Sequence, residues 1–197
     1  MLVITGTLFF FHHRGHGGHG VLLIKQKKLY VLCALCGEFP YLCSVMEKFE
    51  LHILGCGSAL PTTRHFATSQ VVNVRDKLYM IDCGEGSQLQ FRKSRLKFSR
   101  LNHIFISHLH GDHCFGLLGL ISTLNLLGRT AELHIHSPKG LETLFAPMLS
   151  FFCRQMTYKV IFHEFETKEP GMIYEDRSLT VTTIPLRHRM PCCGFLF

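Results

Sequence analysis

Residues 107–113 read Ser107-His108-Leu109-His110-Gly111-Asp112-His113 and place three imidazoles and one carboxylate within six positions. The apolar run at 103–106, His103-Ile104-Phe105-Ile106, predicts a buried strand just before them, and the apolar segment that follows predicts a helix. Residues two apart on an extended backbone point to the same side. His108 and His110 can therefore bind one ion through their ring nitrogens.

Gly111 permits a tight turn, after which Asp112 and His113 leave the backbone in a different direction. That direction suits a second ion beside the first. Imidazole together with carboxylate favours zinc, with iron or manganese as substitutes. The alternative is that these residues are polar loop groups that cap the helix 114–127. Crowded imidazoles need partners, which favours the metal.

The pattern His-x-His-x-Asp-His at 108–113 resembles the signature of the metallo-β-lactamase superfamily, and within it the chain is similar to the ribonuclease Z family. Phe49–Pro61 resembles that family's first strand and glycine turn, Met80–Gln88 its aspartate motif, and Ile184–Phe195 the segment with a third histidine. Together they cover about residues 46–197. The resemblance implies an α/β fold, the αββα sandwich, of which this chain supplies roughly the N-terminal half.

The resemblance also implies roles for individual residues. One zinc ion is expected on His108, His110 and His188, and a second on Asp112 and His113. Asp112 is expected to act as the general base that accepts a proton from water.

Asp82 ends a predicted strand and is expected behind the metal ligands, bonded to the metal-binding histidines; direct contact with the site is the alternative. His134-Ile-His136 repeats the His-x-His spacing. It is expected to mark only one face of a strand.

The resemblance implies a zinc-dependent endoribonuclease that removes the 3′ trailer from precursor tRNA by two-metal hydrolysis and leaves a tRNA 3′-hydroxyl. Family members are commonly homodimers, and the expected location is the cytoplasm, without a membrane partner. Two alternatives stay open. One is another hydrolase of the same fold, such as a small-molecule phosphodiesterase or an arylsulfatase-like or lactonase-like enzyme. The other is an inactive fragment or non-catalytic binding module.

Residues 92–100 hold five basic side chains in nine positions. They predict either a solvated helix end or contacts with RNA phosphates, which would be independent of sequence and sensitive to salt. Two further arginines flank His188 and could hold the scissile phosphate. The candidate RNA contacts are Arg92, Lys93, Arg95, Lys97, Arg100, Arg187 and Arg189.

The composition agrees with a buried α/β domain in a reducing compartment. Of 197 residues 47% are apolar, which supports a sizeable core. The formal net charge of +7 is compatible with a polyanionic partner. The nine cysteines are scattered and odd in number, which is typical of reduced thiols, and Cys33-Ala-Leu-Cys36 is expected to have no metal or redox role.

Residues 1–45 resemble no part of the family and are predicted to be an extraneous or disordered extension, with the natural start at Met46. They include a His/Gly tract at 12–20 and no apolar stretch long enough to span a bilayer. The family's remaining metal ligands belong after Phe197. The chain is therefore expected to resemble an N-terminal fragment that alone binds metal weakly, aggregates and has little nuclease activity.

Periodicity and turn residues predict the elements of the domain. Helices are expected at 85–96, at 114–127 and from Ser137-Pro138 to about 151. Strands are expected at 49–55, 69–75, 78–81, 100–106, 132–136, 158–165, 172–174, 178–186 and from 194, with 69–75 and 78–81 forming a hairpin.

Overall fold

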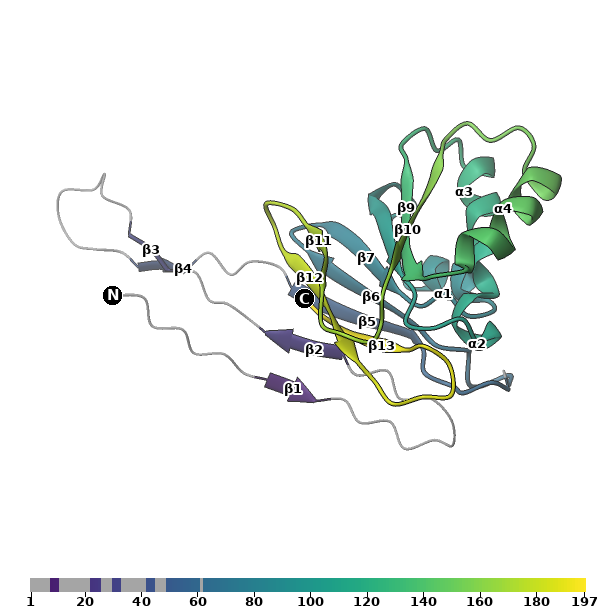
Figure 1. The fold of residues 1–197 in the computed structure, drawn as a ribbon. Coiled ribbons are helices and arrows are strands. Elements are labelled where there is room, and N and C mark those ends of the chain that lie inside the picture. Colours follow the sequence, from purple (N-terminus) through teal and green to yellow (C-terminus); the bar gives the residue numbers. More distant parts are fainter. Residues whose placement is uncertain (1–7, 11–21, 26–29, 33–41, 45–48, 61) are drawn as a thin grey trace.

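The fold is that of a computed structural model, which describes residues 8–10, 22–25, 30–32, 42–44, 49–60 and 62–197. Its centre is a six-stranded sheet with the order β10-β9-β8-β7-β6-β5 (Figure 1). Strands β5 to β7 pair antiparallel, and β7 to β10 pair parallel. The strands are β5 Phe49–Gly55, β6 Ser69–Val74, β7 Lys77–Ile81, β8 Leu101–Phe105, β9 Leu133–Pro138 and β10 Val160–Phe165.

A two-residue turn joins β6 to β7. Both of its central residues, Arg75 and Asp76, have positive φ, at 51° and 66°. Two left-handed residues in succession match the twist of antiparallel strands, as in a type I′ turn. The hairpin predicted here is confirmed.

Four helices lie on one face of this sheet (Figure 1), because each parallel strand needs a long crossover to reach the next. They are α1 Ser87–Lys93, α2 Gly111–Cys114, α3 Gly116–Leu126 and α4 Leu141–Phe152, and the short 3-10 helix η1 is Phe98–Arg100. Phe91, Leu120 and Phe145 of three of these helices join one core with Met80 and Ile104 of the sheet. None of the helices in the described part of the chain has the length and apolar character needed to cross a membrane.

The other face of the sheet packs against a second sheet with the order β1-β2-β13-β12-β11. Tyr79 and Phe105 of the first sheet contact a core that contains Val181 and Phe195 of the second. Side chains that alternate along one strand therefore serve two cores. The second sheet consists of β1 Leu8–Phe10, β2 Leu22–Lys25, β11 Met172–Glu175, β12 Thr180–Pro185 and β13 Cys193–Leu196; β3 Tyr30–Leu32 and β4 Leu42–Ser44 pair with each other.

The predicted boundary at residue 45 stays a prediction. Most of residues 1–45, including the His/Gly tract at 12–20, lies outside the described residues, as do Met46, Cys33 and Cys36. The strands described there include β2, which pairs in parallel with β13.

The helix predicted at 85–96 is shorter than expected. Gly86, with φ at 78°, directly precedes α1, and Arg95, with φ at 55°, follows its end at Lys93. A left-handed residue interrupts the helical hydrogen bonds, so the basic stretch continues as a turn and η1 rather than as helix.

Two other helix boundaries also differ. The prediction that Ser137 and Pro138 start a helix is wrong, because both end β9 and pair with β10. Helix α4 begins after Gly140, whose φ is 105°. The helix predicted at 114–127 begins earlier and divides at Phe115 into α2 and α3, while Gly128, with φ at 73°, ends it as predicted.

Candidate metal centre

The candidate metal centre lies where the parallel strands β7 and β8 end. Ile81 pairs with Phe105 at the ends of these strands, and the backbone N–H of Asp82 donates to the carbonyl of Phe105 at 2.8 Å. The turns after the two strands therefore leave the sheet side by side. In open α/β sheets, ligands bind beyond the carboxyl ends of the parallel strands.

Three histidines converge at this edge. One ring nitrogen each from His108, His110 and His188 lies within 4.8 Å of the other two. Nε2 of His108 is 3.1 Å from Nδ1 of His110, and the ring of His188 lies 4.7 Å and 4.9 Å from theirs, centroid to centroid. Within residues 49–60 and 62–197 no other group of three potential ligands is this close.

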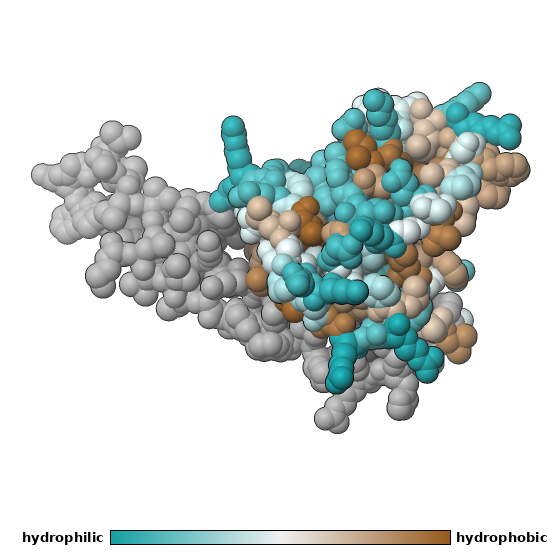
Figure 2. Space-filling model, viewed as in Figure 1, coloured by the Kyte–Doolittle hydropathy of each residue, from teal (hydrophilic) through white to brown (hydrophobic). Residues whose placement is uncertain are grey.

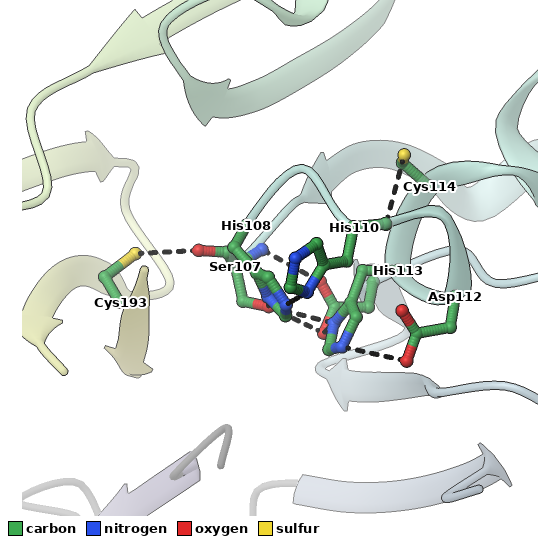
Figure 3. Close-up of polar contacts among 8 residues, drawn as sticks. Ser107, His108, His110, Asp112, His113, Cys114 and Cys193 are labelled. Atoms are coloured by element: carbon green, nitrogen blue, oxygen red, sulfur yellow. Dashed lines mark hydrogen bonds and ion pairs between the residues drawn. The ribbon is translucent and has the colours of Figure 1, made fainter. Parts of the chain in front are cut away.

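Asp112 and His113 lie next to this group on α2. Oδ2 of Asp112 is 3.6 Å from Nε2 of His113, whose ring centroid is 3.8 Å from that of His108 (Figure 3). The backbone N–H of Cys83 donates to the carbonyl of His113 at 2.7 Å and fixes α2 against the end of β7. All five residues predicted as ligands thus come together.

Asp82 lies behind the histidines. Its Oδ2 accepts hydrogen bonds from Nδ1 of His113 at 2.7 Å and from Oγ of Ser107 at 3.0 Å, and its Oδ1 accepts from the backbone N–H of Ser107 at 2.8 Å. Asp82 is 4% exposed, so its negative charge is compensated by these bonds rather than by water. Its φ of 56° turns the backbone at the end of β7.

Burial and neighbouring charge decide the protonation of these histidines. Burial, followed by the nearby His113, lowers the pKa of His108 to about 3. Burial, followed by His110, also lowers the pKa of His188. Burial is the largest single influence on His113 and opposes its protonation, but the charge of Asp82, its hydrogen bond and the charge of Asp112 together raise the pKa of His113.

These residues suit a zinc ion. His108 and His188 are neutral at pH 7, and a neutral imidazole has a free lone pair for a metal. Three imidazole nitrogens within 4.8 Å of one another, with one carboxylate beside them, form a donor set that zinc accepts.

The candidate RNA contacts fall into two groups. Arg187 and Arg189 are exposed and flank His188 at the centre. Lys97 and Arg100 precede β8 and so lie at the opposite end of this strand from Ser107; β8 is roughly 17 Å long at about 3.3 Å per residue. Arg92, Lys93 and Arg95 are exposed near the end of α1, and Arg100 forms an ion pair with Asp76 at 2.8 Å.

A second group of histidines occupies the sheet face that packs on β11. His134 and His136 of β9 lie on the same side of the strand, as expected from their spacing, and stack with His103 of β8 and His163 of β10. Nδ1 of His103 is 3.3 Å from Nε2 of His136. None of the four belongs to the three-histidine group.

Ser107 is a residue of the centre that the sequence interpretation assigned no role. Its side chain is buried, and its hydroxyl lies within hydrogen-bonding distance of His108 and His113 (Figure 3). The same hydroxyl also lies within hydrogen-bonding distance of Asp82. Its position directly before the first histidine of the motif was the available signal.

Comparison with known proteins places the chain in a family. A family model described as "Anti-Pycsar protein Apyc1" matches residues 49–196. The ribonuclease Z of Bacteroides thetaiotaomicron is 85% identical over 152 residues, which are 77% of this chain and 48% of that protein. The ribonuclease Z of Phocaeicola vulgatus is 72% identical over 77% of this chain and 49% of its own length. The chain therefore spans about half the length of the curated relatives it matches.

Solved structures agree on the fold. The short form of human tRNase Z superposes with a TM-score of 0.68 at 30% identity, over 74% of this chain and 63% of that one. A metallo-β-lactamase fold protein of Bacillus subtilis superposes with a TM-score of 0.57 at 18% identity, over 74% of this chain and 56% of its own, and so shares the fold. The chain belongs to the family of the anti-Pycsar protein Apyc1 model, has the predicted α/β metallo-β-lactamase fold and is similar over three quarters of its length to bacterial ribonuclease Z.

Proposed function

We propose that the protein is a zinc-dependent endoribonuclease that removes the 3′ trailer from precursor tRNA and leaves a 3′-hydroxyl on the tRNA. The observation that carries this proposal is the convergence of His108, His110 and His188 beside Asp112 and His113. The names of relatives 72–85% identical to the chain support the choice of substrate.

Two zinc ions, held by these five residues, would supply a water that loses its proton near neutral pH and would stabilise the charge that develops on the phosphate. Asp112 would accept the proton of the attacking water, and its largely buried carboxylate beside His113 suits a general base. Attack by water breaks the bond between phosphorus and the 3′ oxygen of the tRNA. The tRNA then keeps a hydroxyl and the trailer keeps the phosphate.

The basic residues have separate roles in this proposal. Arg187 and Arg189 would contact the phosphates next to the cleaved bond, because both are exposed beside His188. Arg92, Lys93, Arg95, Lys97 and Arg100 would contact the RNA backbone farther away. Replacing Lys97 by Gln should then weaken tRNA binding and make it less sensitive to salt. The slope of the logarithm of the binding constant against the logarithm of the salt concentration should become shallower by about 0.7–0.9 per lost contact.

A second candidate is hydrolysis of a small phosphodiester at the same centre. It is kept as a candidate because the description of the family model does not name a ribonuclease, unlike the names of the curated relatives. A metal centre on a shared fold does not by itself select the substrate. An arylsulfatase-like or lactonase-like activity, or a non-catalytic role, would rest on the fold alone.

The test compares two substrates. Two proteins are tested: the 197-residue chain, and a chimera in which the 152 matched residues of this chain replace their counterparts in the B. thetaiotaomicron relative. Each is incubated with zinc and either end-labelled precursor tRNA or bis-p-nitrophenyl phosphate. We expect the chimera to produce trimmed tRNA with a 3′-hydroxyl, its formation abolished by Asp112→Asn and unchanged by Glu142→Gln, which alters an exposed acid of α4. Hydrolysis of the small ester alone by the chimera would favour the second candidate, and hydrolysis of neither substrate by the chimera would contradict both.

We further propose that the protein acts in the cytoplasm as a homodimer. The six cysteines with described side chains are free thiols, which suits a reducing compartment. Exposed apolar side chains support a dimer: Figure 2 shows tan and brown atoms at the right-hand end of the molecule, where α4 lies. They include Leu144, Met148, Phe151 and Phe152, each at least 40% exposed. Sedimentation of the protein and of Phe151→Asp would show a dimer and a monomer, respectively.

A further inference from the structure

Ser107 is held in place by the ends of β7 and β8 and by β13. Its backbone N–H donates to Asp82 after β7, and its carbonyl accepts from the backbone N–H of Cys193 in β13 at 3.1 Å. The residue itself lies two positions after the buried end of β8 at Phe105 and is 2% exposed. Its hydroxyl therefore has a fixed position and no access to bulk water.

The hydroxyl of Ser107 meets three possible partners. Its Oγ is 3.0 Å from Oδ2 of Asp82, 3.2 Å from Nδ1 of His108 and 3.1 Å from Nδ1 of His113. A hydroxyl has one hydrogen to donate and two lone pairs that accept. The direction of these bonds therefore determines where His108 carries its proton.

An ionised carboxylate only accepts hydrogen bonds, so the hydroxyl of Ser107 donates its single hydrogen to Asp82. Its oxygen can then only accept from His108, which requires a proton on Nδ1 of that ring. The neutral ring of His108 consequently has its lone pair on Nε2. That atom is the one that faces Nδ1 of His110, at 3.1 Å.

The same carboxylate acts on His113. Nδ1 of His113 lies 2.7 Å from Oδ2 of Asp82 and donates to it, while Nε2 faces Asp112 at 3.6 Å. Asp82 thus fixes the proton of His113 on Nδ1 directly, and that of His108 on Nδ1 through the hydroxyl of Ser107. The two histidines belong to the two neighbouring ion positions of the proposed centre.

We propose that Ser107 is a positioning residue. Its hydroxyl donates to Asp82 and accepts from Nδ1 of His108, which keeps Nε2 of His108 unprotonated and free for a metal. This inference rests on the proposed metal centre, but the proton position can be measured without metal or RNA. Residues that orient metal-binding histidines in this way commonly contribute 10–100-fold to metal affinity.

The test uses the full 197-residue chain, labelled with ¹⁵N and free of metal, at pH 7.5. Long-range ¹H–¹⁵N spectra distinguish a protonated from an unprotonated ring nitrogen, and His108→Gln identifies the signals of His108 by their loss. We expect the proton of His108 on Nδ1 in the unmodified chain. A proton mainly on Nε2 would overturn the proposal. This outcome needs no variant of Ser107 and is independent of whether the protein cleaves RNA.

Two variants of nearly equal shape provide the matched control. Ser107→Thr keeps the hydroxyl, whereas Ser107→Val replaces it by a methyl group, so both add the same bulk to this buried position. We expect the Thr variant to keep the Nδ1 proton and the Val variant to shift His108 toward an Nε2 proton, with zinc affinity roughly 10–100-fold lower in a chelator competition. Equal zinc affinity and an equal proton position in the two variants would show that Ser107 only fills space.

Discussion

Nδ1 of His113 lies 2.7 Å from Oδ2 of Asp82, although 31 positions separate the two residues in the sequence. The side chains are only 8% and 6% exposed, so the bond joins the turn after β7 to α2 inside the protein. It couples the orientation of a candidate ligand to a residue that is not a member of the three-histidine group.

Asp82→Asn should lower both zinc affinity and stability. Asn tolerates the left-handed backbone of this position, so the variant removes the charge without adding strain. We expect a free energy of unfolding lower by about 1.5–3 kcal/mol, typical of a lost hydrogen bond to a charged group, and zinc affinity roughly 10–100-fold lower. Urea unfolding and chelator competition measure the two effects, and unchanged values would contradict a supporting role of Asp82.

Gly84→Ala should distort the centre through the backbone. A Cβ at Gly84 would clash with both the carbonyl oxygen of Asp112 and Cβ of Ala67, so the backbone on both sides must shift. We expect a loss of about 1–3 kcal/mol in the free energy of unfolding and weaker zinc binding. Gly171→Ala is the control, because its Cβ would meet only Thr183 at 3.9 Å.

His110→Ala and His134→Ala should separate the metal centre from the second histidine group. Both residues belong to a His-x-His pattern, but only His110 joins the close group with His108 and His188. We expect His110→Ala to reduce zinc affinity at least tenfold and His134→Ala to leave it within twofold, as measured by chelator competition. A comparable loss in both variants would contradict the assignment of the site.

The second histidine group should make the stability of the protein sensitive to acid. Burial, followed by neighbouring histidines, lowers the pKa of His103 to about 4 and that of His136 to about 3. Asp176 partly opposes this at His103, and Lys77 adds to it. Both pKa values lie below the ordinary value of 6.5, so the unfolded chain binds protons first as the pH falls.

The stability contributed by these two histidines is therefore complete above pH 6.5 and is lost progressively as the pH falls from there toward 4 and 3. For His136, which is 3% exposed, the expected loss approaches about 1.4 kcal/mol per pH unit. Urea unfolding at pH 7, 6 and 5 should show a flatter dependence for His136→Leu than for the unmodified protein. Replacing the exposed His65 by Leu should leave the slope unchanged, and equal slopes in all three proteins would contradict the prediction.

Much of the fold could be predicted because local patterns determine it. The run Leu78–Ile81 is apolar throughout since Met80 faces the helices and Tyr79 the second sheet. The hairpin and the end of α3 followed from turn residues. The helix starts were less predictable: Ser137 and Pro138 carry helix-start chemistry, but pairing with β10 keeps them in β9.

The sequence by itself determined the group His108, His110, Asp112 and His113, because four potential ligands within six positions at a strand–helix junction remain close in almost any packing. The family resemblance named His188 and Asp82, but only the tertiary structure brings His188 from the loop before β13 to the other two histidines, joins Asp82 to Ser107 and His113, and stacks His103 of β8 with His134 of β9. These contacts depend on which strands pair and in what register. Short-range backbone geometry does not contain that information, because it arises only when distant apolar faces bury each other.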